Sequence, residues 1–236
     1  ADRAFQAGKP IVALKVGRSE KGREAAASHT GAMSGSDAVY DGFFRQKSII
    51  RVLDIDELLE VANLLARYRP PAGDRVAILS SSGGSGALLA DLASDSHLRL
   101  PAPSSRTRDQ LRNLIPALAE IANPMDITTQ FMNDPEAIVR YLKAFADDEN
   151  FDVLIINFTV STSDRTLRVA ERIAALVPSL PKPLIVCWPV GNMARQAFSC
   201  LERAGVPLFF HPGRCLAAVG HFVRYGLRKK SRLQRF

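Results

Sequence analysis

The feature that most constrains the fold of this 236-residue chain is the alternation of short apolar runs and helical patterns in its second half. The apolar runs are expected to be buried strands, at residues 75–80, 151–158, 183–188 and 207–210. Helical patterns lie between and after them, at residues 87–93, 106–118, 134–146, 164–177, 192–203 and 213–227. Such alternation indicates an α/β fold with helices on both faces of a parallel sheet. We therefore predict a flavodoxin-like, doubly wound domain over residues 75–236.

A smaller α/β unit is expected before this domain. Residues 11–16 and 49–52 are predicted strands, and Asp54 is placed to cap an amphipathic helix that ends before Arg69. Two prolines and a glycine in residues 69–74 are typical of a linker. The predicted domains are therefore residues 1–69 and 75–236. Because the chain opens on a helix-like stretch without Met, we expect the natural protein to extend beyond it.

Composition argues against several classes of protein. No apolar run approaches the roughly 20 residues that span a bilayer, and residues 1–9 lack a signal-peptide core. We expect a cytoplasmic protein that binds neither membrane nor nucleic acid. The net charge of +7 gathers toward the C-terminal end, which we interpret as a solvated helix end. The three cysteines are far apart and no histidines have ligand spacing, so we expect reduced thiols and no metal site.

His29 is the first candidate for chemistry. It lies between Ser28 and Thr30-Gly31, near the end of a stretch of small residues that follows a predicted strand, and we expect a loop there. A neutral imidazole, with a pKa of about 6.5, can attack a phosphoryl group, and small neighbours would let it move. A surface histidine with no chemical role is the alternative. The other histidines, His97, His211 and His221, are expected to be structural or exposed.

Two further segments are candidates. Gly83, Gly84, Ser85 and Gly86 lie between a strand and a helix, where bare N–H groups bind phosphate and glycines permit close approach. The same residues would also suit a tight turn, and they match neither the Walker loop nor GxGxxG. In the segment 123–128, Asn123 and Asp126 are expected to brace a loop by bonding backbone N–H groups.

These motifs together resemble a known family. Ser28-His29-Thr30-Gly31-Ala32, with residues 9–18 and 35–52 around it, resembles the nucleoside-diphosphate-forming acyl-CoA synthetases, relatives of succinyl-CoA synthetase. Gly83 to Gly86 and Asn123-Pro124-Met125-Asp126 look like the family's glycine loop and Asn-Pro-x-Asp element. The resemblance implies the C-terminal part of a phosphohistidine domain over residues 1–69, followed by a second flavodoxin-like ligase domain.

The function implied by this resemblance is that of an acid–CoA ligase (ADP-forming). It would interconvert acyl-CoA, ADP and phosphate with carboxylic acid, CoA and ATP, and His29 would be phosphorylated. Ser28, Thr30, Gly31 and the Gly83–Gly86 segment would surround the phosphate. No tightly bound cofactor is expected in this chain, because ATP or ADP, CoA and Mg would be held by an ATP-grasp domain or subunit and by a CoA-binding Rossmann domain. A homo-oligomer is compatible with the resemblance.

Two other functions are compatible with the same sequence. One is a non-catalytic, synthetase-like regulatory module that is fused to or partners an acetyltransferase, although the presence of His29 argues against it. The other is an FMN-binding flavodoxin, which the topology permits but does not establish. The sequence does not identify the acyl substrate or distinguish ADP from GDP.

Overall fold

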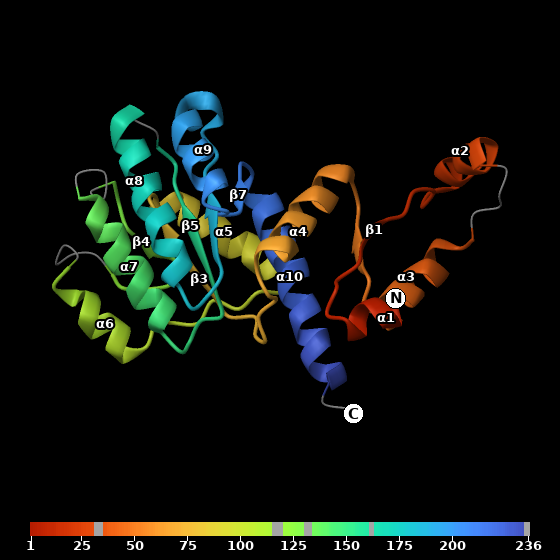
Figure 1. The fold of residues 1–236 in the computed structure, drawn as a ribbon, viewed down its shortest axis with the longest axis horizontal. Coiled ribbons are helices and arrows are strands. Elements are labelled where there is room, and N and C mark those ends of the chain that lie inside the picture. The colour runs from red at the N-terminus through yellow and green to blue at the C-terminus, as the bar shows by residue number, and fades with distance from the viewer. Residues whose placement is uncertain (31–34, 115–119, 130–133, 161–162, 234–236) are drawn as a thin grey trace.

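The computed structural model describes residues 1–30, 35–114, 120–129, 134–160 and 163–233. Figure 1 shows an elongated molecule, with the N-terminal elements at one end of its long axis and a five-stranded sheet at the other. The elements of the first 67 residues are α1 (Asp2–Gln6), β1 (Val12–Leu14), α2 (Glu20–Thr30), α3 (Asp37–Gln46), β2 (Ile50–Val52) and α4 (Ile55–Arg67). Residues 69–74, the predicted linker, contain neither helix nor strand.

The second region contains the larger sheet. Its strands are β3 (Val76–Ser80), β4 (Met125–Asp126), β5 (Val153–Asn157), β6 (Leu184–Cys187) and β7 (Leu208–Phe209). The helices are α5 (Gly83–Asp95), α6 (Ser105–Arg112), α7 (Pro135–Asp147), α8 (Ser163–Leu176), α9 (Arg195–Arg203) and α10 (Pro212–Leu233), with short 3-10 turns η2 (Val177–Ser179) and η3 (Gly191–Ala194).

The five strands are parallel and lie in the order β4-β3-β5-β6-β7. Counted from the first strand of this region, that is the order 2-1-3-4-5, which is the flavodoxin-like arrangement. The predicted fold class is therefore confirmed. In this arrangement the carboxyl ends of all five strands meet at one edge, where ligands of such folds collect.

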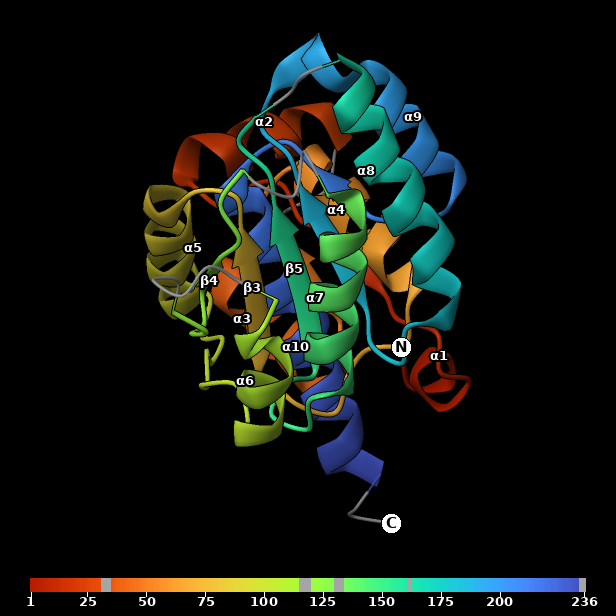
Figure 2. The same cartoon turned by 90° about the vertical axis from the view of Figure 1, so that its left-hand side faces the viewer.

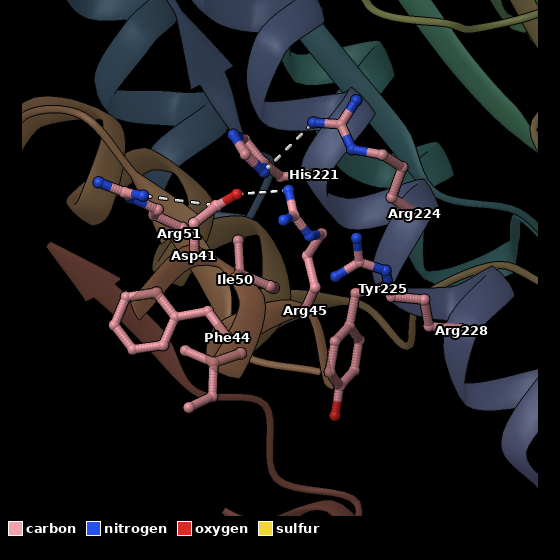
Figure 3. A pocket seen from close by; sticks show the side chains of 10 residues that line it. Asp41, Phe44, Arg45, Ile50, Arg51, His221, Arg224, Tyr225 and Arg228 are labelled. Carbon is pink, nitrogen blue, oxygen red and sulfur yellow. Dashed lines mark hydrogen bonds and ion pairs between the residues drawn. The ribbon is translucent and has the colours of Figure 1, made fainter. Parts of the chain in front are cut away.

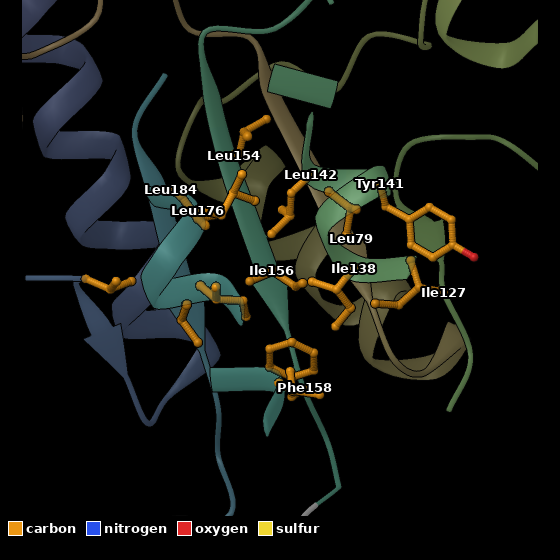
Figure 4. Packing of buried hydrophobic residues seen from close by; sticks show 14 of the residues in the cluster. Leu79, Ile127, Ile138, Tyr141, Leu142, Leu154, Ile156, Phe158, Leu176 and Leu184 are labelled. Carbon is orange, nitrogen blue, oxygen red and sulfur yellow. The ribbon is translucent and has the colours of Figure 1, made fainter. Parts of the chain in front are cut away.

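Helices cover both faces of the sheet, and each face has its own apolar core (Figure 2). On one face, α7, α8 and α9 pack over side chains such as Leu79, Leu154 and Ile156, as Figure 4 shows for part of the cluster. On the other face, α5 and α10 pack over Val76 and Ile155. Every residue of β3, β5 and β6 is buried, which is why these strands appear in the sequence as continuous apolar runs.

The N-terminal region packs against the second of these faces. β1 and β2 form a two-stranded parallel sheet, and α4 lies against α10. Ile50, Val52, Val61 and Leu64 belong to the same buried cluster as β3 and β5. The two regions therefore share one core, and the division into domains at residues 69–75 stays a prediction.

Polar contacts also join the two regions across the seam, the surface where residues 1–69 pack against α10 and the five-stranded sheet. The Arg214 guanidinium on α10 lies 3.0 Å from Glu60, and His221 lies 3.0 Å from Glu57, both glutamates being on α4. The Tyr68 hydroxyl donates to the carbonyl of Leu184 at 3.1 Å. These contacts connect the end of the N-terminal region to both α10 and β6.

Several element boundaries differ from prediction for identifiable reasons. Helix α5 begins at Gly83 rather than Ala87, because Ser82 caps it, its side chain accepting from the Ser85 N–H. The edge strand β4 has only two residues, too few for a periodic pattern. Helix α10 continues to Leu233, beyond the expected residue 227. No helix was predicted at α3. The Asp54 cap of α4 is confirmed, since Asp54 accepts from the Glu57 N–H at 2.8 Å.

Within the ranges that the structure describes, no helix is long and apolar enough to cross a membrane. The same residues contain no cluster of three or more histidine, cysteine or acidic side chains that could hold a metal ion.

Candidate functional site

The glycine segment forms the first turn of α5, directly after β3 and at the carboxyl edge of the sheet. Two amides of this turn have protein acceptors: the Ser85 N–H donates to the Ser82 hydroxyl, and the Gly86 N–H donates to the Ser82 carbonyl at 2.9 Å. The amides of Gly83 and Gly84 have no acceptor in the described part of the chain, and both glycines are exposed. The turn therefore presents two bare N–H donors at the positive end of a helix dipole.

The absence of a side chain at Gly84 keeps this approach open. A Cβ built there would meet only the Ser82 hydroxyl, at 4.0 Å, so no other atom of the described residues lies within 4 Å of that position. At Gly83 a Cβ would lie 3.0 Å from the Asp126 carboxylate. An anion would therefore approach from the side of Gly84, away from the negative charge of Asp126.

A buried asparagine holds the turn in place. Asn157, the last residue of β5, is fully buried, and its Oδ1 accepts from the hydroxyls of Ser85 at 2.7 Å and Ser80 at 3.1 Å. Its Nδ2 donates to the carbonyl of Cys187 on β6 at 3.2 Å. The sequence analysis missed Asn157. A detectable signal was a single amide side chain ending an otherwise apolar strand, since a buried amide needs partners.

The neighbouring strand-end loops are tied to one another. The Ser81 hydroxyl accepts from the Thr159 N–H at 2.9 Å and lies 3.1 Å from the Thr159 hydroxyl. The Trp188 indole N–H donates to the carbonyl of Val160 at 2.9 Å. The loops that follow β3, β5 and β6 are thus joined to one another by hydrogen bonds at the edge of the sheet where the glycine turn lies.

Asn123 and Asp126 each bond backbone groups. Asn123 accepts from the Ile78 N–H at 2.9 Å and donates to the carbonyls of Val76 and Pro101, at 2.8 and 2.9 Å. Asp126 accepts from the Thr128 N–H at 2.8 Å. Asn123 therefore fastens the segment before β4 to β3, and Asp126 holds its own turn beside Gly83.

The segment before His29 is a helix, which corrects the predicted loop. Residues Glu20–Thr30 form α2, and His29 lies in its last turn with an exposed side chain, as does Ser28. Alanines at 25–27 and the charged residues Glu20, Lys21, Arg23 and Glu24 are good helix formers, and Ser19 accepts from the Gly22 N–H at 3.1 Å at the start. These local preferences outweigh the small-residue character on which the loop was based. Gly31 lies outside the described residues, as does the side chain of Thr30.

The structure does not bring His29 and the glycine turn together. Figure 1 shows α2 at the far end of the long axis from α5 and the five-stranded sheet. The remaining histidines are elsewhere: His97 and His211 are exposed, whereas His221 contacts Glu57 at the seam. Any chemistry that uses both candidate elements therefore requires them to meet through a change of position or through another chain.

Comparison with known proteins shows that the chain is similar to part of the ADP-forming acetate–CoA ligases. Residues 1–65 match the family described as the succinyl-CoA ligase like flavodoxin domain. The chain is 34% identical over 220 residues to the alpha subunit of ADP-forming acetate–CoA ligase II of Pyrococcus furiosus, covering 92% of this chain and 48% of that protein. It is 33% identical to the ADP-forming acetate–CoA ligase I of Archaeoglobus fulgidus, covering 92% of this chain and 30% of that protein.

The fold is shared with a solved structure. The dinucleotide forming acetyl-coenzyme A synthetase 1 of Ca. Korarchaeum cryptofilum, in complex with phosphate and ADP, superposes with a TM-score of 0.86 at 26% identity, over 99% of this chain and 51% of that one. The chain is therefore homologous to part of the ADP-forming acetate–CoA ligases, which confirms the resemblance to nucleoside-diphosphate-forming acyl-CoA synthetases. It spans about half or less of the length of these relatives.

Proposed function

We propose that this chain is part of an acid–CoA ligase (ADP-forming) that carries a phosphoryl group on His29. The observation that supports this most is the similarity over more than nine-tenths of the chain to ADP-forming acetate–CoA ligases from separate archaea. The bare amides of Gly83 and Gly84 support it independently, because phosphoryl transfer requires fixed donors around a doubly charged group.

The proposed reaction has three steps. Phosphate attacks the acyl carbon of acyl-CoA, the C–S bond breaks and CoA leaves, which produces an acyl phosphate. A ring nitrogen of His29 then attacks phosphorus, the P–O bond to the acyl group breaks and the carboxylate leaves. Finally a terminal oxygen of ADP attacks the phosphohistidine, the P–N bond breaks and ATP forms. Each step is reversible, and Gly83 and Gly84 would donate hydrogen bonds to the phosphoryl oxygens.

Partners follow from this proposal. An ATP-grasp domain or subunit would hold the nucleotide and Mg, and a CoA-binding Rossmann domain would hold the thioester, so this chain itself needs no tightly bound cofactor. The exposed position of His29 on a helix that projects from the body suits a group that visits sites on more than one domain. Ser28, Thr30 and Gly31 would shape its surroundings at each of them.

The decisive test is a phosphorylation assay of the complete enzyme with γ-labelled ATP. The wild-type protein should acquire an acid-labile, base-stable label, and His29→Ala should lose both the label and the ligase reaction. Because His29 is exposed, its replacement should leave the thermal unfolding midpoint nearly unchanged. His97→Asn is the matched control, since His97 is also exposed and Asn tolerates its positive φ of 58°. A label that persists in His29→Ala would refute the assignment.

A second test concerns the glycine turn. Gly84→Val should place a branched side chain in the open space before the bare amides and slow phosphoryl transfer by roughly 10²-fold. Gly84→Ala is the matched control: it fits the same space with a smaller side chain and should raise the free energy of unfolding by up to about 1 kcal/mol. Equal phosphoryl transfer in wild type and Gly84→Val would leave the segment a turn without a role in binding phosphate.

A further inference from the structure

A cluster of arginines lies away from both His29 and the glycine turn. Between α3, β2 and α10 the structure has a cavity of about 230 Å³ (Figure 3). Its lining includes Arg45, Arg51, Arg224 and Arg228, but among the lining residues Asp41 is the only acidic one. Four arginine side chains thus line one cavity, and they come from two regions that are separated in sequence by more than a hundred residues.

The arginines of the N-terminal region have acidic partners, but these are shared. Asp41 forms ion pairs with both Arg45 and Arg51, the latter at 3.3 Å, and Arg51 also contacts Asp37 at 2.6 Å. The Nε of Arg51 is buried and has no hydrogen-bond partner in the described structure. One polar N–H of a residue that lines the cavity therefore lacks an acceptor.

The two arginines of α10 that line the cavity, Arg224 and Arg228, have no carboxylate partner in the described residues. Arg224 donates to the carbonyl of Ser96 at 3.2 Å and to Nδ1 of His221 at 3.3 Å. The carboxylate of Glu57, on the same side, bonds to the opposite nitrogen of that imidazole. Arg228 forms no ion pair in the same part of the chain. Burial, and then the charge of Arg228, hold the pKa of Arg224 below its ordinary range.

Such a cluster suits an anion with several oxygens. Guanidinium groups bind phosphate through paired hydrogen bonds, and half-buried like charges are stabilised when an anion lies between them. The volume suffices for one or two phosphate groups with a few waters, each water needing about 30 Å³. It is smaller than the roughly 300–1,000 Å³ of pockets that enclose whole drug-sized ligands.

We propose that this cavity is a second phosphate-binding site, distinct from the glycine turn, for inorganic phosphate or for a phosphate group at the end of a small molecule. Arg228 and Arg224 on α10 and Arg51 on β2 would bind its oxygens. Because these donors come from both sides of the seam, the bound anion links the N-terminal region to α10. The site does not depend on the function proposed for His29.

The test is calorimetric titration of the full chain with inorganic phosphate at constant ionic strength, in a Gly84→Val background that closes the glycine turn. Arg228→Gln should weaken phosphate binding at least about tenfold, because a hydrogen bond between charged groups is lost. Since Arg228 has no ion pair to lose, the variant should fold normally. Lys230→Gln is the matched control: it removes the same charge from an exposed position of α10 outside the cavity.

The outcomes separate clearly. Intermediate affinity in Arg228→Lys, and unchanged affinity in Lys230→Gln, would support the site. Repeating the titration with ADP distinguishes the sources: an Arg228-dependent affinity for ADP indicates a nucleotide phosphate, and its absence indicates the free ion. No binding of phosphate at millimolar concentration, or equal weakening by Arg228→Gln and Lys230→Gln, would overturn the proposal. The label on His29 is measured separately, so either proposal can fail alone.

Discussion

The two regions of the chain are stabilised in different ways. In residues 75–236, three strands are buried along their whole length between two layers of helices. In residues 1–69, each strand has three residues, and α1 and α3 contribute no buried side chain. Large apolar side chains such as Val16, Val39 and Phe43 remain exposed there. The N-terminal region is therefore held mainly by β2 and α4 against α10, rather than by a core of its own.

The same truncation in both regions should expose this difference. Leu142→Ala on α7 removes a fully buried side chain and should lower the free energy of unfolding by about 2–5 kcal/mol. Leu14→Ala on β1 removes a partly buried one and should cost roughly 1 kcal/mol. Urea denaturation of the two variants measures the contrast, and equal losses would contradict it.

The single tryptophan makes that experiment sharper. Trp188 is fully buried beside β6, so its fluorescence reports the five-stranded sheet, whereas far-ultraviolet circular dichroism reports all helices. Because Val61 and Leu64 lie in one cluster with β3 and β5, the two signals should change together in the wild-type protein. Separate transitions would mean that the seam is weaker than its shared core implies.

The sequence predicted the larger region well because its signals are strong. Buried parallel strands are continuous apolar runs, and Pro135 marks the start of α7 by a known preference for the first helical position. It predicted the smaller region less well. The small residues around 25–31 were interpreted as a loop, although alanines and charged residues favour the helix that the structure has.

The candidate site likewise contains features that the sequence could indicate and features that it could not. Gly83 to Gly86 could be located from the sequence, since they lie between a predicted strand and a predicted helix, where bare N–H groups are expected. The partners of Asn157 could not be predicted, because they depend on the register that places β5 beside β3 and on Ser85 facing Asn157 across the edge. The sequence could not predict the cavity beside Arg228 either, because α3 and α10 are brought together only by the tertiary fold.

A glycine at the seam gives the next largest expected effect. A Cβ at Gly226 would clash with the carbonyl of Pro71, which approaches to 2.0 Å of that position. Gly226→Ala should therefore push α10 away from the linker and lower the free energy of unfolding by about 1–3 kcal/mol. Gly42→Ala on α3 is the matched control, because a Cβ there meets nothing within 4 Å and a helical alanine is favourable. If both variants unfold at the same urea concentration, α10 and the linker are not in contact in solution.

The smallest expected effect is the pH dependence of the seam. The pKa of Glu57 is held below its ordinary range, chiefly by the hydrogen bond from His221 and also by the Leu53 N–H, against the opposing effect of burial. A carboxyl whose pKa is lower in the folded than in the unfolded chain contributes stability above its unfolded pKa of about 4.3. That contribution is lost as the pH falls through the lower, folded value.

Glu57→Gln removes this ionisation while keeping the shape of the side chain. The variant should be less stable than wild type at pH 7, by less than about 1 kcal/mol once solvent screening is allowed for. The difference should shrink as the pH falls below about 4.3, because the wild-type carboxyl then becomes neutral as well. Urea midpoints between pH 7 and about pH 3.5 would measure this, with Glu202→Gln, an exposed α9 substitution, as the matched control. A difference that stays constant with pH would show that Glu57 acts at the seam through packing rather than through its charge.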